Sequence, residues 1–187
     1  MGLLLVWTQP IHAQESSAFE KIRDVSPDGK FAVRVSCSSE PEDPHDIDSN
    51  LITAVDLVSL PSKKVVANIG QNDGGSAPDL IWSRDSEWFA FPLSEGHRVT
   101  DTYVYHRSGD DFSRLETEKL RVDAKGDVRN EYVKPVRWVR PGVLLLEQFD
   151  IFRGGDSEEA TYQFTAKFDE KTGKFQISSK KKVPSKE

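Results

Sequence analysis

Six polar residues in two expected loops are the side chains of this sequence best suited to binding a ligand. They are Glu95, His97, Arg98, Asp101, Arg153 and Asp156. Carboxylate, imidazole and guanidinium groups together offer both donors and acceptors to a charged partner. Loops displayed by a rigid scaffold are where binding residues concentrate. We therefore treat these six as candidate ligand-binding residues, with ordinary solvated surface charge as the alternative and more common role.

Catalytic and metal-binding patterns are missing from the sequence. The nucleophile motif Gly-x-Ser-x-Gly does not occur, since Gly74-Gly75-Ser76-Ala77-Pro78 ends in proline. The four histidines do not follow metal-ligand spacing. The acidic segment 38–50 lacks the glycine-punctuated ligand order of calcium loops and is expected to be solvated. We predict no enzyme activity, no catalytic residue, no metal and no cofactor.

Composition describes an acidic protein of 187 residues with a formal net charge of −6. This length is sufficient for one domain with a sizeable core. The net negative charge disfavours nonspecific binding to nucleic acid, which is itself a polyanion. Lys180, Lys181, Lys182 and Lys186 form a basic tail, which we read as a solvated terminus that ends at 184–187.

The N-terminus resembles the end of a secretory signal. Leu3-Leu4-Leu5-Val6-Trp7 is a short apolar run, and the small residue Ala13 precedes Gln14. The run is too short to span a bilayer. We expect a signal peptide at 1–14, without the usual basic start, and a secreted or periplasmic mature domain at 15–183. A buried N-terminal strand is the alternative.

Apolar runs between turn residues predict β-strands around these loops. Residues 88–93 are almost continuously apolar and aromatic, which suits a strand covered on both faces. Tyr162 to Phe168 alternates apolar and polar residues, then 169–173 turns the chain into a second strand. Residues 120–128 fit a hairpin, whereas 116–121 also fit a helical turn.

The single cysteine is expected in the core. Cys37 has no partner for an internal disulfide. It shares one strand face with Phe31, Val33 and Val35 by the two-residue period of a strand. A packed, unreactive thiol is the interpretation that this pattern favours.

One turn-and-strand pattern recurs along the chain. Ser26-Pro27-Asp28-Gly29-Lys30-Phe31-Ala32 matches Ser83-Arg84-Asp85-Ser86-Glu87-Trp88-Phe89 at an offset of 57 residues, and Trp82 matches Trp138 at an offset of 56. A period slightly above 50 residues, with several strands in each copy, is typical of propeller blades.

The repeat resembles the TolB-like β-propeller repeat, whose pattern is Trp-Ser-Pro-Asp-Gly-Lys followed by an apolar strand and a Tyr-Val strand. Residues 25–32, 81–91 and 103–105 carry this resemblance. The copies depart from it, because Val25 replaces tryptophan, Ser86 replaces glycine, and the third copy lacks the aspartate.

The resemblance implies an all-β fold of three propeller-blade-like antiparallel sheets, with units at about 20–70, 76–121 and 130–183. Three blades are fewer than the roughly four that closed propellers need. We therefore expect either an open arrangement or a ring completed by dimerisation.

The fold implied by the resemblance does not name a function. We expect a non-enzymatic binding protein whose partner is an envelope or extracellular protein, or a second copy of the chain. The alternative is an accessory or degenerate relative of a propeller-bearing hydrolase that binds peptide or glycan.

Overall fold

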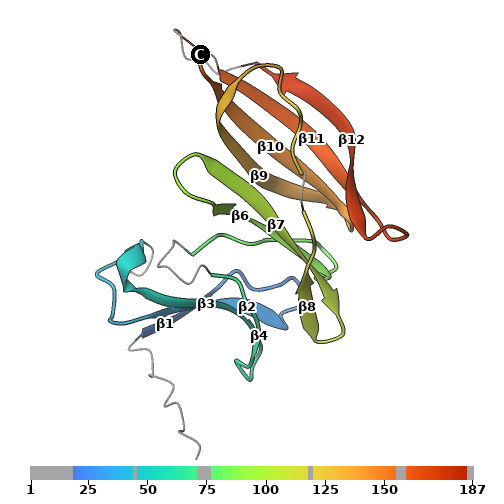
Figure 1. Ribbon diagram of the computed structural model, residues 1–187. Helices are drawn as coiled ribbons and strands as arrows, with labels where there is room; N and C mark the ends of the chain where they lie inside the picture. Colours follow the sequence, from blue (N-terminus) through green and yellow to red (C-terminus); the bar gives the residue numbers. More distant parts are fainter. Residues whose placement is uncertain (1–18, 44–45, 71–76, 118–119, 155–158, 185–187) are drawn as a thin grey trace, which may run out of the picture.

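The chain is built from β-strands. The computed structural model describes residues 19–43, 46–70, 77–117, 120–154 and 159–184 (Figure 1). Within these ranges it contains one short 3-10 helix, η1 (Ser49–Leu51), and no α-helix, which confirms the all-β fold class. None of the described residues belongs to a helix long and apolar enough to cross a membrane. The expected signal peptide at 1–14 lies outside the described residues.

Three consecutive groups of four strands each form an antiparallel meander. The first unit comprises β1 (Phe19–Arg23), β2 (Phe31–Cys37), β3 (Ile52–Ser59) and β4 (Val65–Asn68). The second unit comprises β5 (Ile81–Trp82), β6 (Trp88–Ser94), β7 (Val99–Ser108) and β8 (Asp111–Arg114). The third unit comprises β9 (Val128–Arg140), β10 (Val143–Phe152), β11 (Glu159–Asp169) and β12 (Lys174–Val183).

The expectation of three separate sheets is wrong. The second and third units join in one mixed sheet of eight strands, the first unit forms a four-stranded antiparallel sheet, and neither is closed. The join is a short parallel pairing of Val99 with Glu131 and Thr100 with Tyr132. It forms because β9 starts well before Trp138, while β8 covers β7 only from Tyr105 onward. The uncovered start of β7 therefore meets the extra residues of β9.

The repeated turns at 26–31 and 83–88 have the same hydrogen bonds. In each, the serine hydroxyl donates to the aspartate two positions later, at 2.6 and 2.5 Å. It also accepts the N–H of the aromatic residue five positions later, at 3.0 Å in both turns. Gly29 and Ser86 hold the left-handed position, with φ of 70° and 61°. Ser86 Oγ accepts the Asp28 N–H at 2.9 Å, so the two turns touch.

One tryptophan connects the second unit to the first, and another connects the third unit to the second. The Trp82 indole N–H donates to the carbonyl of Asp24 at 2.8 Å. The Trp138 indole N–H donates to the carbonyl of Ile81 at 2.9 Å. Asp24 and Ile81 lie 57 residues apart and directly precede matching positions of the repeat. The units therefore stack with the same contact twice, and β6 is covered on both faces.

The first seam, between the first and second units, is an apolar core. Its buried members include Phe31, Val33, Val35, Cys37, Leu57, Phe89, Phe91, Tyr105 and Phe112. Phe89 stacks on Tyr105 with ring centroids 4.7 Å apart. Cys37 is fully buried, as its alternation with Val33 and Val35 predicted. Burial raises the pKa of its thiol, which keeps this cysteine a weak nucleophile.

The second seam, between the second and third units, is partly built from irregular chain. Its buried members include Trp88, Ala90, Val104, Leu144, Leu146 and Phe164, together with Leu120 and Val122. The last two belong to the strap, whose described residues 115–117 and 120–127 lead from β8 to β9 and cross in front of β10 and β11 in Figure 1. The described residues of the strap form no strand or helix, so the hairpin expected at 120–128 is absent.

Candidate functional site

The structure separates the five candidate residues that it describes. Glu95 and Asp101 line one pocket at the start of β7. The backbone carbonyls of His97 and Arg98 accept hydrogen bonds from Tyr132 Oη and the Glu131 N–H, and the side chains of both residues are exposed. Arg153 follows β10 and forms an ion pair with Asp127 at 3.7 Å. Asp156 lies outside the described residues.

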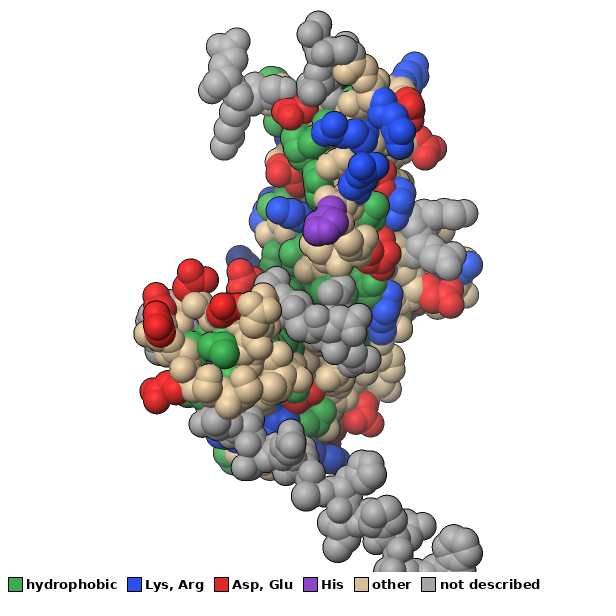
Figure 2. All heavy atoms as spheres, turned by 60° about the vertical axis from the view of Figure 1, so that its left-hand side comes forward, with side chains coloured by type: hydrophobic (Ala, Val, Ile, Leu, Met, Phe, Trp, Pro, Cys, Tyr) green, Lys and Arg blue, Asp and Glu red, His purple; other side chains and the backbone are tan. Residues whose placement is uncertain are grey.

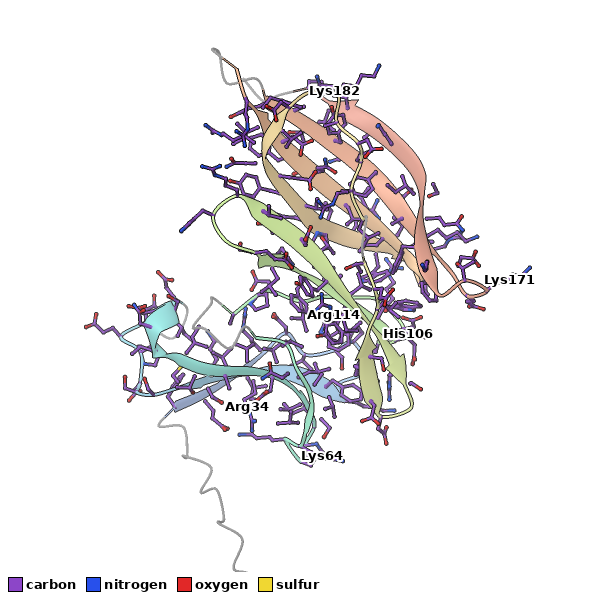
Figure 3. All side chains as sticks on the ribbon, in the orientation of Figure 1. Arg34, Lys64, His106, Arg114, Lys171 and Lys182 are labelled. Carbon is purple, nitrogen blue, oxygen red and sulfur yellow. The ribbon has the colours of Figure 1, made fainter. Side chains whose placement is uncertain are left out.

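The pocket is a hollow of about 410 Å³ between the start of β7, the end of β8 and the strap. Its described lining residues are Glu95, Asp101, Tyr103, Arg114, Leu115, Glu116, Thr117 and Arg121. The Tyr103 hydroxyl donates to Glu95, and the Arg114 guanidinium lies 3.8 Å from the centroid of the Tyr103 ring. Figure 3 labels Arg114 where β8 crosses β7. Burial, and then the Glu95 hydrogen bond, raise the pKa of Tyr103, so it remains a neutral donor.

Arg121 connects the pocket to the second seam. One guanidinium nitrogen lies 2.8 Å from Asp101 of the second unit, and the other lies 2.7 Å from Glu131 of the third unit. The strap that carries Arg121 therefore forms ion pairs with both units that it connects. Ion pairs with half-exposed members contribute little individually, but here one cation holds two carboxylates in place.

Gln148 fixes the strap from below. Its side chain is fully buried, and Oε1 accepts the Val122 N–H at 2.7 Å. Nε2 donates to the Val122 carbonyl at 3.0 Å and to both oxygens of Asp150, at 3.1 and 2.9 Å. The amide thus replaces, for an irregular segment, the two backbone hydrogen bonds that a neighbouring strand would supply.

Two carboxyl groups beside this amide have pKa values above their ordinary values. Burial raises the pKa of Asp150, although Gln148 and Arg121 act in the opposite direction. Burial also raises the pKa of Glu131; Arg121 opposes that shift, and the charge of Asp150 adds to it. Perturbed carboxyl groups beside a hollow are typical of functional sites, although structural networks also produce them.

The described lining of the pocket supplies charged and hydrogen-bonding groups to a ligand. Among the described residues that line it there is no serine, cysteine or histidine, and its polar groups are carboxylates, guanidinium groups and the hydroxyls of Tyr103 and Thr117. Across the described residues, no group of three or more His, Cys, Asp or Glu side chains is arranged to hold a metal ion.

Sequence reasoning missed most residues of this region. Tyr103, Arg114 and Arg121 come from segments that were interpreted as strand or undecided chain. Gln148 and Asp150 did carry a usable signal, since they continue the inward alternation of Leu144 and Leu146. Two polar residues on a core-facing stripe indicate a buried hydrogen-bonded partner.

The comparisons with known proteins give no relative from which a role could be transferred. Neither a protein-family model, nor a curated protein, nor a solved structure matches this chain.

Proposed function

We propose that the chain is a non-enzymatic binding protein of the periplasm or extracellular space. Its pocket at the start of β7 receives a basic side chain from an envelope or extracellular protein. The observation that carries this proposal is the lining of the pocket, where three carboxylates face two guanidinium groups.

Both guanidinium groups of the pocket are already engaged. Arg121 pairs with Asp101 and Glu131, and Arg114 covers the ring of Tyr103. Glu116 is exposed and has no ion pair within the described part of the chain, and Glu95 accepts only the Tyr103 hydroxyl. The free acceptor capacity of the pocket is therefore anionic, which favours a lysine or arginine side chain as ligand.

The hydrolase-related alternative, in which the chain binds peptide or glycan, has less support where the ligand is a glycan. A sugar ring would need an open aromatic face to stack on, and Arg114 occupies a face of Tyr103. A peptide segment needs only hydrogen-bonding partners and charge, which the pocket supplies.

Fluorescence anisotropy with short labelled peptides tests the proposal. The peptides share one sequence except for a central lysine, arginine, alanine or glutamate. We expect the lysine and arginine peptides to bind more tightly than the other two. Glu116→Gln should weaken that binding by about two- to fivefold, the value of one exposed ion pair of about 0.5–1 kcal/mol.

Glu170→Gln, in the exposed turn between β11 and β12, is the matched control and should leave peptide affinity unchanged. Equal affinity for all four peptides would refute a cationic ligand. Cleavage of a peptide or glycan, lost in Asp101→Asn or His97→Ala, would instead support the hydrolase-related reading.

A further inference from the structure

One broad face of the third unit remains open after the three units have stacked. Along β10, Leu144, Leu146, Gln148 and Asp150 point inward and are buried. Val143, Leu145, Glu147, Phe149 and Ile151 alternate with them and stay partly exposed. Neither apolar core includes these outward residues. We call this surface the outer face.

The outer face carries an array of cations. The strand register places Arg137 beside Leu145, Lys134 beside Glu147, and both Arg140 and Lys167 beside Val143. Lys181 lies beside Gln163 in the same way. The members of this array, which are all exposed, are Lys134, Arg137, Arg140, Lys167 and Lys181.

These cations lack acidic partners in the part of the chain that the structure describes. None of the five takes part in an ion pair there. Two carboxylates also lie on the outer face: Glu147 accepts a hydrogen bond from Gln163 Nε2 at 3.2 Å, and Glu159 lies beside Ile151. A strongly basic face on a protein with a net charge of −6 is a local concentration of charge that a complementary surface would neutralise.

The complementary surface is present on the same chain, at its other end. Glu40, Glu42 and Asp46 lie in the segment between β2 and β3, and all three are exposed without an ion pair to any described residue. Figure 2 shows Asp and Glu side chains gathered over the first unit, whereas Lys and Arg side chains gather over the third unit above it. The molecule is thus divided into an acidic end and a basic end.

We propose that the outer face of the third unit binds the acidic end of a second copy of this chain. Face-to-face pairing of two outer faces would oppose five cations to five cations, so the contact is head to tail. The apolar centre along β10, with Leu145 and Phe149, is rimmed by charge, as in ordinary protein interfaces. A head-to-tail contact closes into a ring or extends as a chain of copies. This surface is separate from the pocket and does not depend on its ligand.

Sedimentation velocity over a range of protein concentrations tests the proposal. At about 0.1 M salt, where the screening length is about 10 Å, repulsion between whole molecules is damped but contact pairs persist. We expect concentration-dependent association under that condition. At about 1 M salt, with a screening length of about 3 Å, the association should be lost.

Charge reversal identifies the two surfaces. Lys134→Glu with Arg137→Glu, and separately Glu40→Lys with Glu42→Lys, should each raise the dissociation constant by about tenfold or more, because like charges then meet. An equimolar mixture of the two variants should recover association, because the native acidic end of one variant meets the native outer face of the other, and the two reversed surfaces also have opposite charge. Lys30→Glu with Lys64→Glu is the control for the outer-face variant, because it makes the same change in net charge at exposed positions of the first unit. Figure 3 shows Lys64 at the end of the molecule opposite to Lys182.

Three outcomes would overturn the proposal. The native protein could stay monomeric at about 0.1 M salt at every concentration. The control variant could dissociate as much as the outer-face variant, or the mixture could fail to associate. A monomer that co-sediments with phosphatidylcholine vesicles containing phosphatidylglycerol, but not with pure phosphatidylcholine, would assign the outer face to an anionic membrane instead.

Discussion

The two seams between the stacked units have the same topological role but different chemistry. The first is filled by aromatic and aliphatic side chains, and its charged contacts, Arg107 with Asp28 at 3.1 Å and Arg23 with Asp79, are partly exposed. The second buries Gln148 and Asp150 completely, beneath a strap without regular structure. The stability of an apolar seam depends on how well its side chains pack. The stability of a seam with buried carboxyl groups depends on pH as well. The second seam is therefore the responsive part of the molecule.

Breaking the first seam should have the largest effect. Phe89 is fully buried and lies between Trp82, Tyr105 and Phe112, at centroid distances of 5.0, 4.7 and 5.2 Å. Phe89→Ala should lower the free energy of unfolding by about 3–5 kcal/mol, through lost burial and a residual cavity. Chemical denaturation followed by tryptophan fluorescence measures the change. A loss below about 1 kcal/mol would show that this seam is not a close-packed core.

Breaking the polar part of the second seam should cost less and act locally. Gln148→Leu removes the partner of both Val122 backbone groups and the amide donor of Asp150. We expect a loss of about 1–3 kcal/mol, the cost of buried polar groups left without partners. Hydrogen exchange should quicken at the Val122 amide while amides of β2 keep their protection. Gln163→Leu, on the outer face, is the control. Equal exchange rates of the Val122 amide in both variants would contradict the role of Gln148 in holding the strap.

The contact between the two repeated turns gives a smaller prediction. Ser86 has a left-handed backbone, φ 61°, and its hydroxyl accepts the Asp28 N–H. Ser86→Ala loses the hydrogen bond and keeps the strain, whereas Ser86→Gly loses the bond but relieves the strain. The glycine variant should therefore be the more stable of the two by about 1 kcal/mol. Thermal denaturation of the pair measures the difference, and a more stable alanine variant would mean that this backbone is not strained.

The contributions of the two seams to stability should also change in opposite directions as the pH falls. Glu131 and Asp150 have raised pKa values, so their folded forms hold protons that the unfolded chain releases. Their contribution to stability is present at low pH and is lost as pH rises through their folded pKa values. Burial would raise the pKa of Asp28, but hydrogen bonds from Ser26, the Lys30 N–H and Arg107 lower it overall. Its contribution is present above its ordinary value of 3.8 and is lost as pH falls below that value.

The free energies of unfolding of the native protein and of Asp150→Asn, both measured from neutral pH down to 3.8, show how much the second seam contributes to the pH dependence. Acidification from neutral pH toward 3.8 should raise the free energy of unfolding of the native protein, and it should raise that of the variant by less. An equal gain in the variant would remove Asp150 as a cause.

Local features of this fold were predictable from the sequence because local chemistry determines them. The serine and aspartate of the turns at 26–31 and 83–88 bond their own backbone. The apolar run at 88–93 lies in β6 and is covered on both faces, and the alternation from Tyr162 lies in β11. Cys37 is buried in the core. In each case the residues that specify the structure lie within a few positions of one another.

Long-range features were not predictable. The parallel pairing of β7 with β9 depends on how far β9 extends ahead of Trp138, and Gly126-Asp127 before its first residue do not specify which strand it will meet. The strap shows no strand or helix period, so its burial depends on Gln148 across the seam. Arg121 joins the site only because the strap places it between Asp101 and Glu131. The expected envelope or extracellular partner and the export of the chain stay predictions.

Carbon-13 NMR titration of the side-chain carboxyl groups tests the contrast between the seams most directly, because it measures each group separately in the folded protein. The account predicts that Asp150 titrates above its ordinary value of 3.8 and Glu131 above 4.5, while Asp28 titrates below 3.8. Titration of Asp150 and Glu131 at or below those values would contradict it, since the second seam would then hold ordinary solvated carboxylates.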